Sequence, residues 1–373
     1  MVQHLLEGFS QPSGGTDPDI ICYHVNVRLS EDLGDVGSLR FGKVLTLLRC
    51  CFGALAFRFR HGIRNFYYVP SPPKRGSLYR DWIVMAMMRP FFHRVIFHWH
   101  AVGLGEWLDE KARPWERWIS HRLLGGVEQS LVLSQFNEAD AARLSPKRID
   151  VVPNGIPDPC PDYARGLASD RAARWEQIRS ETEKRIEPVT VRVLFLALCT
   201  RDKGVHTAVE GILLANRQLA AAGDRFRFML MVAGTFVDEV EKLDFDRMCR
   251  VEEGGKTIRL TGFLDSAAKM TAFRQADVFL FPTYYANEGQ PLNILEAMAW
   301  GLPVVTTRWR AIPEMVPAGQ PGLIEPRSPE QVAEALMEVV RKADPAVFRR
   351  NFEERFRIEA HLDRLRAVLL FRS

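Results

Sequence analysis

The stretch F-L-F-P-T-Y-Y-A-N-E-G-Q-P-L-N-I-L-E-A-M-A-W-G-L-P-V-V, residues 279–305, decides the fold class. Its apolar start predicts a buried strand that ends at Pro282. Pro291 stands at a plausible first position of a helix, and Gly301 closes that helix. A second apolar run follows at 302–307. Strand, helix and strand in this order predict a unit with two parallel strands.

The same alternation extends in both directions along the chain. Further strands are predicted at 20–27, 65–70, 94–100, 130–134, 149–153, 191–198, 227–234, 257–262 and 277–282, and a long helix is predicted at 205–222. The fold class is therefore predicted to be α/β, with two doubly wound domains that face a central cleft. Ligands in such folds bind at the carboxyl ends of the strands.

The polar stretch 157–188 separates the two runs of strands. We expect an N-terminal Rossmann-like domain at 1–160, a linker at 161–188, a second Rossmann-like domain at 189–347 and a C-terminal helix at 348–373. The C-terminal pattern is amphipathic and has no strand after it, so we expect it to pack back on the first domain.

Composition limits the class of protein. The 373 residues are 47% hydrophobic and 26% charged, which is typical of a globular chain with two domains. The net charge of +4 is too small to indicate nucleic acid as a partner. The six cysteines lack the spacing of a metal site or a disulfide framework, and no apolar run is long enough to cross a bilayer. We expect a cytoplasmic protein, at most peripheral at the inner face of the membrane.

Glu296 is the first candidate site residue. Leu292, Leu295 and Ala299 recur at helical spacing and predict the inward face, and Glu296 follows Leu292 by four residues on much the same face. A buried carboxylate needs partners, which vicinal hydroxyls could supply, and free amides at the start of this helix would suit a phosphate. The alternative is that Glu296 points to the rim and solvent.

The whole string resembles a family signature. E-G-x-P-L-x-x-L-E-A-M-A-x-G-x-P-V-V is similar to the donor site of the family-4 retaining glycosyltransferases of GT-B fold, whose two glutamates are spaced E-x(7)-E. The resemblance is strongest over about residues 190–340. It implies that Glu288 contacts hydroxyls of the transferred sugar and that Glu296 contacts the ribose. Sugar and diphosphate would meet the segment formed by Gly289, Gln290, Pro291 and Leu292.

A second candidate site lies in the strand-to-helix turn L-C-T-R-D-K-G (198–204). Arg201 and Lys203 stand where the helix macrodipole disfavours cations, so they need a compensating anion or are solvated surface charges. The resemblance implies that Lys203 binds the donor diphosphate. The family's arginine commonly stands further upstream, where this chain has Ala197, so Arg201 is its substitute here.

Two more segments match the family pattern. V-I-F-H-W-H-A-V-G-L (95–104) resembles the segment whose histidine reaches the transferred sugar; His100 matches it, and His98 is the runner-up because it points the same way in a strand. Thr261, Gly262 and Phe263 lie where the family places part of its nucleobase pocket, although the same residues also fit an ordinary strand-ending turn.

The start of the chain departs from the family pattern. The resemblance implies an opening strand and a Gly-rich loop, whereas this chain begins with the helix-like V-Q-H-L-L-E-G-F before the strand expected at 20–27. Gly14-Gly15 follows that helix and is not the missing loop. We therefore expect that the sequence is truncated or that its start is assigned late.

The resemblance implies a metal-independent hexosyltransferase without a cofactor. Its donor is a nucleoside-diphosphate sugar and its acceptor a hydroxyl of a glycan or a lipid-linked molecule, with catalysis by Glu288, Lys203 and His100. Epimerases and phosphorylases share this architecture, but the E-x(7)-E string argues against both. The alternative that stays open is a non-catalytic or impaired nucleotide-sugar-binding protein of the same fold.

The region 40–94 is strongly basic. It contains eleven Lys and Arg residues and one acid, Asp81, among many apolar residues. This pattern predicts reversible docking on an anionic membrane surface. The alternative is a domain core with a solvated face of arginines.

Overall fold

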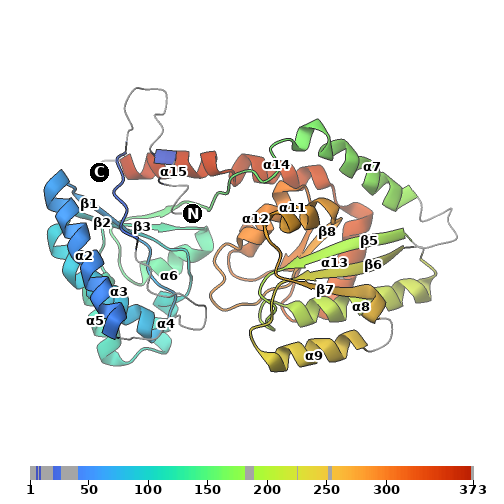
Figure 1. The fold of residues 1–373 in the computed structure, drawn as a ribbon, viewed down its shortest axis with the longest axis horizontal. Helices are drawn as coiled ribbons and strands as arrows, with labels where there is room; N and C mark the ends of the chain where they lie inside the picture. The colour runs from blue at the N-terminus through green and yellow to red at the C-terminus, as the bar shows by residue number, and fades with distance from the viewer. Residues whose placement is uncertain are drawn as a thin grey trace. The chain divides into compact units, whose positions relative to one another are not determined.

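The computed structural model describes residues 6, 8, 9, 20–26, 41–180, 189–224, 226–250 and 254–370. The chain divides into two compact units, each with a parallel sheet and surrounding helices (Figure 1). The first unit comprises Met1–Asn154, Asn287–Gln290 and His361–Ser373, and the second comprises Gly155–Ala286 and Pro291–Ala360.

The first unit contains a four-stranded sheet of order β1-β2-β3-β4. Its strands are β1 (Asn65–Tyr68), β2 (Arg94–His98), β3 (Gln129–Val132) and β4 (Ile149–Val151). Its helices are α2 (Phe41–His61), α3 (Arg75–Met88), α4 (Leu104–Glu110), α5 (Pro114–Leu124) and α6 (Glu138–Ala142), with the 3-10 turns η2 (Arg89–Phe91) and η3 (Gln135–Asn137). Buried residues of β2, β3 and α3, among them Phe97 and Met85, form its core.

The strand expected at 20–27 is absent from the described part of that segment, residues 20–26. Most of its side chains are exposed, and the ring of Tyr23 stacks on His61 of α2 at 4.4 Å between centroids. An apolar run forms a buried strand only where it both pairs with a sheet and packs on a core. In the described sheet β1 pairs only with β2, so residues 20–26 add no strand beside it. Gly14-Gly15 lies outside the described residues.

The second unit contains a six-stranded sheet of order β10-β9-β8-β5-β6-β7. Its strands are β5 (Val189–Leu196), β6 (Phe226–Ala233), β7 (Ile258–Gly262), β8 (Val278–Phe281), β9 (Val304–Thr307) and β10 (Leu323–Ile324). Its helices are α7 (Leu167–Ser180), α8 (Val205–Ala222), α9 (Glu239–Arg250), α10 (Gly254–Thr257), α11 (Ser266–Gln275), α12 (Leu292–Ala299), α13 (Pro329–Lys342) and α14 (Pro345–Arg355), with η4 (Tyr163–Arg165) and η5 (Ile312–Glu314). The doubly wound order places the ends of β5 and β8 side by side.

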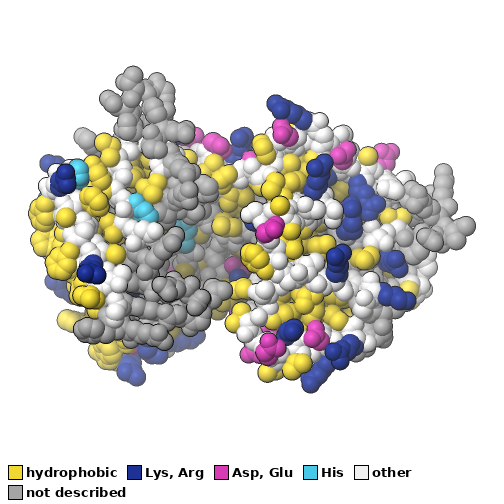
Figure 2. Space-filling model, in the orientation of Figure 1, with side chains coloured by type: hydrophobic (Ala, Val, Ile, Leu, Met, Phe, Trp, Pro, Cys, Tyr) yellow, Lys and Arg dark blue, Asp and Glu magenta, His cyan; other side chains and the backbone are white. Residues whose placement is uncertain are grey.

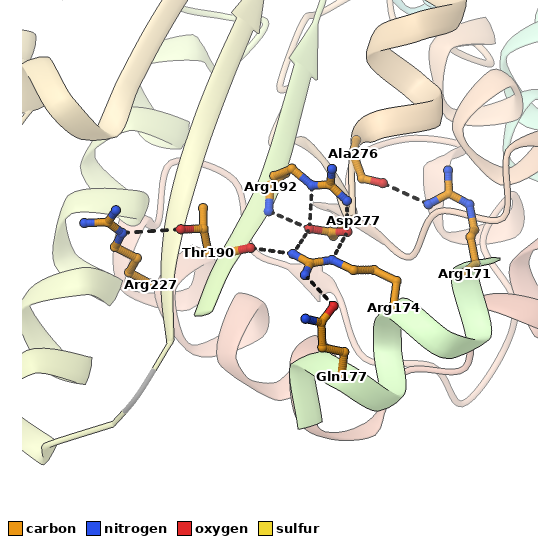
Figure 3. Close-up of polar contacts among 8 residues, drawn as sticks. All are labelled: Arg171, Arg174, Gln177, Thr190, Arg192, Arg227, Ala276 and Asp277. Atoms are coloured by element: carbon orange, nitrogen blue, oxygen red, sulfur yellow. Dashed lines mark hydrogen bonds and ion pairs between the residues drawn. The ribbon is translucent and has the colours of Figure 1, made fainter. Parts of the chain in front are cut away.

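Helix α7 occupies much of the segment expected to be a linker. Its Trp175 and Ile178 are buried in the core of the second unit. Its Arg174 reaches Asp277, which stands just before β8, with 3.1 Å between Nη2 and Oδ2. Arg192 of β5 contacts the same carboxylate at 2.9 Å (Figure 3). Burial acts to raise the pKa of Asp277, but hydrogen bonds from Arg192 and Arg174 hold it below its ordinary value.

The C-terminal pattern forms two helices, α14 and α15 (Ile358–Leu370). The chain breaks between them because Phe356 O accepts a hydrogen bond from the N–H of Ile156 at 3.0 Å. From His361 onward, α15 belongs to the first unit, where Arg94 of β2 donates to Leu369 O at 2.8 Å. None of the described helices combines the length and apolar character needed to span a bilayer.

Candidate active site

The loop of residues 287–290 lies in the first unit, although it connects β8 to α12 in sequence. Gln290 is buried, and its Oε1 accepts a hydrogen bond from the N–H of Asn154 at 2.6 Å. A Cβ atom on Gly289 would lie 2.6 Å from His100 O, so only glycine fits there without a shift. The loop therefore carries the buried Glu288 directly beside the end of β2.

His100 follows β2 and is partly exposed. Burial and the nearby His361 lower its pKa to about 4, and a hydrogen bond with the Asn154 side chain acts in the opposite direction. The imidazole is therefore neutral near pH 7, with one nitrogen that donates and one that accepts. A neutral histidine can orient a sugar hydroxyl by hydrogen bonding.

His98 lies beneath His100, with 4.3 Å between the ring centroids. It is fully buried, and its Nδ1 hydrogen-bonds with the hydroxyl of Tyr67. Burial, His100 and His361 together hold its pKa well below the usual range. Because His98 is fully buried and His100 is partly exposed, His100 can contact a ligand. His98 can act only by positioning His100.

Three residues of this arrangement were not predicted from the sequence as site residues: Tyr67, Asn154 and His361. His361 donates from Nδ1 to Pro153 O at 2.7 Å, and its ring centroid lies 6.0 Å from that of His98. Alternation along β1 could have placed Tyr67 on one sheet face, but no local pattern links His361 to β2.

Helix α12 differs in detail from its prediction. Pro291 is the N-cap residue, with extended backbone, and the helix begins at Leu292. Leu292 is 42% exposed, so the prediction that it faces inward is wrong. The buried face contains Leu295 and Ala299 as predicted, together with Ile294 and Met298. Asn293 donates from Nδ2 to Leu196 O at 2.9 Å. This hydrogen bond holds the first turn of α12 at the end of β5, so that Asn293 rather than Leu292 faces inward.

Glu296 lies on the same partly exposed side of α12 as Leu292. Its Oε1 is 2.7 Å from the Nζ of Lys269 on α11. The partner that a half-buried carboxylate needs is therefore present in the protein itself. A ribose would have to share this carboxylate with Lys269.

The turn between β5 and α8 is fastened to the end of β8. Gly204 adopts φ +86°, and a Cβ atom there would lie 2.2 Å from Pro282 O. The N–H of Tyr284 donates to Asp202 O at 2.7 Å. These contacts place Lys203 Nζ 4.4 Å from the ring centroid of Tyr285, a cation–π distance.

Arg201, in the same turn, contacts carboxylates of the protein. Its Nη2 lies 3.1 Å from Asp244 Oδ2, and its N–H donates to Glu241 at 3.2 Å; both acids belong to α9. The compensating anion expected for this cation is thus supplied by the fold, and the side chain is about half exposed.

The end of β7 forms a turn. Thr261 donates from Oγ1 to Val232 O at 3.2 Å, and Gly262 adopts φ +72°. Phe263 is 80% exposed, so its ring is open on the surface. An exposed aromatic ring at the carboxyl end of a strand offers a stacking face for a planar group.

The predicted residues therefore fall into two sets. Within the first unit, the structure brings together His100, Glu288, Gly289 and Gln290. The second unit carries Lys203, Arg201, Glu296, Pro291, Leu292, Thr261, Gly262 and Phe263. Among the described residues there is no group of three or more His, Cys, Asp or Glu side chains placed to hold a metal ion.

The fold is that of the GT-B glycosyltransferases, α/β proteins with two Rossmann-like domains. The Anabaena protein Alr3699/HepE, solved with UDP-glucose, superposes with a TM-score of 0.62 over 89% of this chain and 84% of that one, at 15% identity. Sucrose-phosphate synthase from Thermosynechococcus elongatus gives 0.61 over 95% and 86%, at 18% identity.

Residues 190–342 match the family model of the group 1 glycosyl transferases. The putative colanic acid biosynthesis glycosyltransferase WcaL of Salmonella typhimurium is 33% identical over 149 residues, which is 39% of this chain and 34% of WcaL. The amylovoran biosynthesis glycosyltransferase AmsK of Erwinia amylovora is 28% identical over 39% of this chain and 35% of its own length. These matches span about a third of either relative.

Proposed function

We propose that this chain is a retaining, metal-independent glycosyltransferase of family 4. It moves a sugar from a nucleoside-diphosphate donor to a hydroxyl of a glycan or lipid-linked acceptor. The match of residues 190–342 to the group 1 glycosyl transferases supports the reaction class. The UDP-glucose bound in the Anabaena structure supports a nucleotide sugar as the donor.

The packing of loop 287–290 on His100 is the observation that carries this proposal. Glu288 and His100 are far apart in sequence, yet Gly289 leaves no room for a side chain against His100 O. Both residues resemble family positions that touch the same sugar. In the proposal, Glu288 accepts from sugar hydroxyls, and the neutral His100 orients the sugar by a hydrogen bond.

Lys203 stabilises the leaving diphosphate in this proposal. Its turn is fixed by Gly204 and by the contact of Asp202 with Tyr284, so its ammonium group is held in place before the donor arrives. Charge on the diphosphate grows toward the transition state, and a preorganised cation stabilises that state more than the ground state. Arg201 contributes less, because Asp244 and Glu241 already bind it.

Arg201 already contacts carboxylates of the protein, and this contact favours a second candidate function. A chain with one of its two expected cations occupied could bind nucleotide sugars without transferring the sugar. Release of nucleoside diphosphate distinguishes the two, since only a transferase consumes the donor.

The remaining assignments follow from the same resemblance. Glu296 would accept from the ribose, and Thr261, Gly262 and Phe263 would border the base. The reaction needs no cofactor. A lipid-linked acceptor would bring the chain to the cytoplasmic face of a membrane, and the basic region 40–94 is the part that would meet it.

The test begins with a thermal-shift screen of UDP-, GDP- and ADP-sugars, followed by turnover of the best donor with a lipid and glycan extract. Lys203→Ala is expected to lower kcat by about 10²–10³-fold, the usual loss for one preorganised group, with a smaller change in donor affinity. Lys256→Ala, an exposed lysine of α10, is the matched control and should turn over like the parent. Unchanged kcat in Lys203→Ala contradicts its role, and donor binding without turnover in the parent favours the second candidate.

A further inference from the structure

The inner face of helix α2 packs against the core of the first unit. Leu47 and Cys51 are buried in the core, and Ala54 and Leu55 pack against it. The helix lies beside α3 (Figure 1). This face explains only some of the apolar residues of α2, and the exposed ones need a different explanation.

The opposite face is an exposed stripe, called here the outer stripe: Leu45, Arg49, Phe52, Ala56, Phe59 and Arg60. Leu45, Arg49, Phe52, Ala56 and Phe59 follow one another at intervals of three or four, so they share one side of the helix. Arg60 lies on the same side because it follows Ala56 by four residues. Phe52 is 63% exposed and Phe59 is 66% exposed. Neighbouring large aromatic side chains with this exposure indicate a surface that contacts something other than water.

The neighbouring turn η2 contacts the outer stripe and helix α2. The ring of Phe59 lies edge-on to that of Phe91 of η2, with 5.9 Å between centroids. Arg58 donates from Nε to Phe91 O at 2.8 Å. Phe91 is itself exposed. The aromatic groups therefore form one continuous surface across two elements.

Charge on this surface has one sign. The outer stripe contains Arg49 and Arg60, and helix α2 has no acidic residue in its sequence. The one acid of the 40–94 region, Asp81, is fully buried and paired with Arg80, so it does not offset these charges at the surface. Figure 2 shows Lys and Arg side chains among the hydrophobic ones where Figure 1 draws α2.

We propose that the outer stripe docks the first unit on an anionic lipid bilayer. The phenylalanine rings enter the boundary between headgroups and acyl chains, and the arginines contact lipid phosphates. A second copy of the chain fits this surface poorly, because an isologous contact would bring together two surfaces of the same positive charge. The stripe is thus a membrane-binding face, and a lipid-linked acceptor, which rests on the proposed function, would lie in the same bilayer.

A comparable apolar group in the second unit lacks this charge. Val237, Val240 and Leu243, in and beside α9, are exposed to a similar degree. They alternate with Asp238, Glu239, Glu241 and Asp244. Acids repel an anionic bilayer, so this group should stay off the membrane and provides an internal control.

The experiment is cosedimentation of the full chain with vesicles of phosphatidylcholine, with or without phosphatidylglycerol. We expect binding to the anionic vesicles in about 50 mM salt and its loss in about 500 mM salt, because screening shortens the reach of the charges. Arg49→Gln with Arg60→Gln should weaken binding by about fivefold for each arginine. Phe52→Ser with Phe59→Ser should weaken it as well and keep the salt dependence.

Val240→Ser with Leu243→Ser is the matched control and should bind like the parent. All substituted side chains are exposed, and equal melting temperatures check that each variant folds. Absence of binding at low salt, equal binding to neutral vesicles, or full binding by the stripe variants each overturns the proposal. Self-association that the phenylalanine variants abolish would assign the stripe to a second copy instead. Vesicle binding requires no donor, so its failure is independent of sugar transfer.

Discussion

Glu296 illustrates how one side chain can serve two partners. Its contact with Lys269 at 2.7 Å satisfies the carboxylate without a ligand. Lysine holds its charge on a flexible stem, so it can yield part of the carboxylate to a ribose without leaving the site. The ion pair is therefore compatible with a binding role, and the two roles can be separated by substitution.

Glu296→Ala is expected to weaken binding of the free nucleoside diphosphate by about 10- to 100-fold, because a hydrogen bond to a charged group contributes about 1.5–3 kcal/mol. Glu288→Ala should leave that affinity unchanged and lower affinity for the intact nucleotide sugar. Titration calorimetry with both ligands measures the difference. Lys269→Met is the control for the ion pair alone. Were it to match Glu296→Ala in every titration, the carboxylate would be a structural partner of Lys269 rather than a ribose ligand.

At the residue scale, a short string singled out Gly289 and Gln290 as residues that bind substrate, and that role stays a prediction. The structure gives each of them a close contact within the first unit. Leu292 was placed inward because it lies at helical spacing from Leu295 and Ala299. It is the first residue of α12, where Asn293 rather than Leu292 contacts the end of β5, and periodicity does not show which first-turn side chains are covered.

At the level of elements, the Asp277 cluster fastens α7 to the sheet. Arg174 from the helix and Arg192 from β5 converge on one carboxylate that is 1% exposed. Two guanidinium groups balance its desolvation, and a third arginine, Arg171, donates to the adjacent Ala276 O at 2.8 Å. The cluster joins three elements that are separate in the sequence.

Asp277→Asn should destabilise this region by about 3 kcal/mol, because it leaves partly exposed guanidinium groups without their anion. Faster hydrogen exchange in the α7 and β5 peptides measures the effect. Asp162→Asn, which removes an exposed partner of Arg165, should change exchange by less than about 1 kcal/mol. The pKa of Asp277 is lowered in the folded state, so this stability should be present above about pH 4 and lost as the pH falls further. Equal exchange in the two variants would contradict the anchoring role.

Elements with strong periodicity were predicted well. The helix at 205–222 has the predicted bounds because Gly204 and Gly223, both at positive φ, punctuate it. The strand expected at 20–27 is absent from the described residues 20–26, because an apolar pattern does not say whether a segment pairs with a sheet. Polar residues dominate α7, which lies within the segment expected to be a linker, and its few buried side chains include a tryptophan.

On the scale of the whole molecule, uncharged histidines are concentrated in the first unit. His98, His100 and His361 all have lowered pKa values there, chiefly through burial, whereas His206 is the member of the second unit with this shift among the described residues. Each is neutral in the folded state and takes up a proton more readily when unfolded.

The first unit should therefore lose stability as the pH falls from about 6.5, the ordinary histidine value, toward 4. The unfolded chain binds the additional protons in this range, so acid favours it. Hydrogen exchange of β2 and β4 peptides across the range measures the loss, with β8 and β9 peptides for comparison. His361→Gln should flatten the pH dependence of the first unit. A steeper dependence in the second unit would contradict the prediction.

The division of the chain into units was only partly visible in the sequence. Both sheets follow from alternating patterns, but the assignment of residues 287–290 and 361 onward to the first unit depends on tertiary contacts. The contact between Arg94 and Leu369 O joins residues 275 positions apart. No local pattern carries that information, because a helical periodicity describes one face and not what covers it.

The return of α15 to the first unit has a consequence for biosynthesis. Strands β1 to β4 leave the ribosome long before residues 361–370, which supply their contacts at Pro153 and Arg94. The second unit is contiguous except for four residues, so it can complete its core while the first waits. Contacts of such high sequence separation form slowly. The order of maturation therefore runs opposite to the order of synthesis, and the earliest-made strands are the ones that most need protection by chaperones.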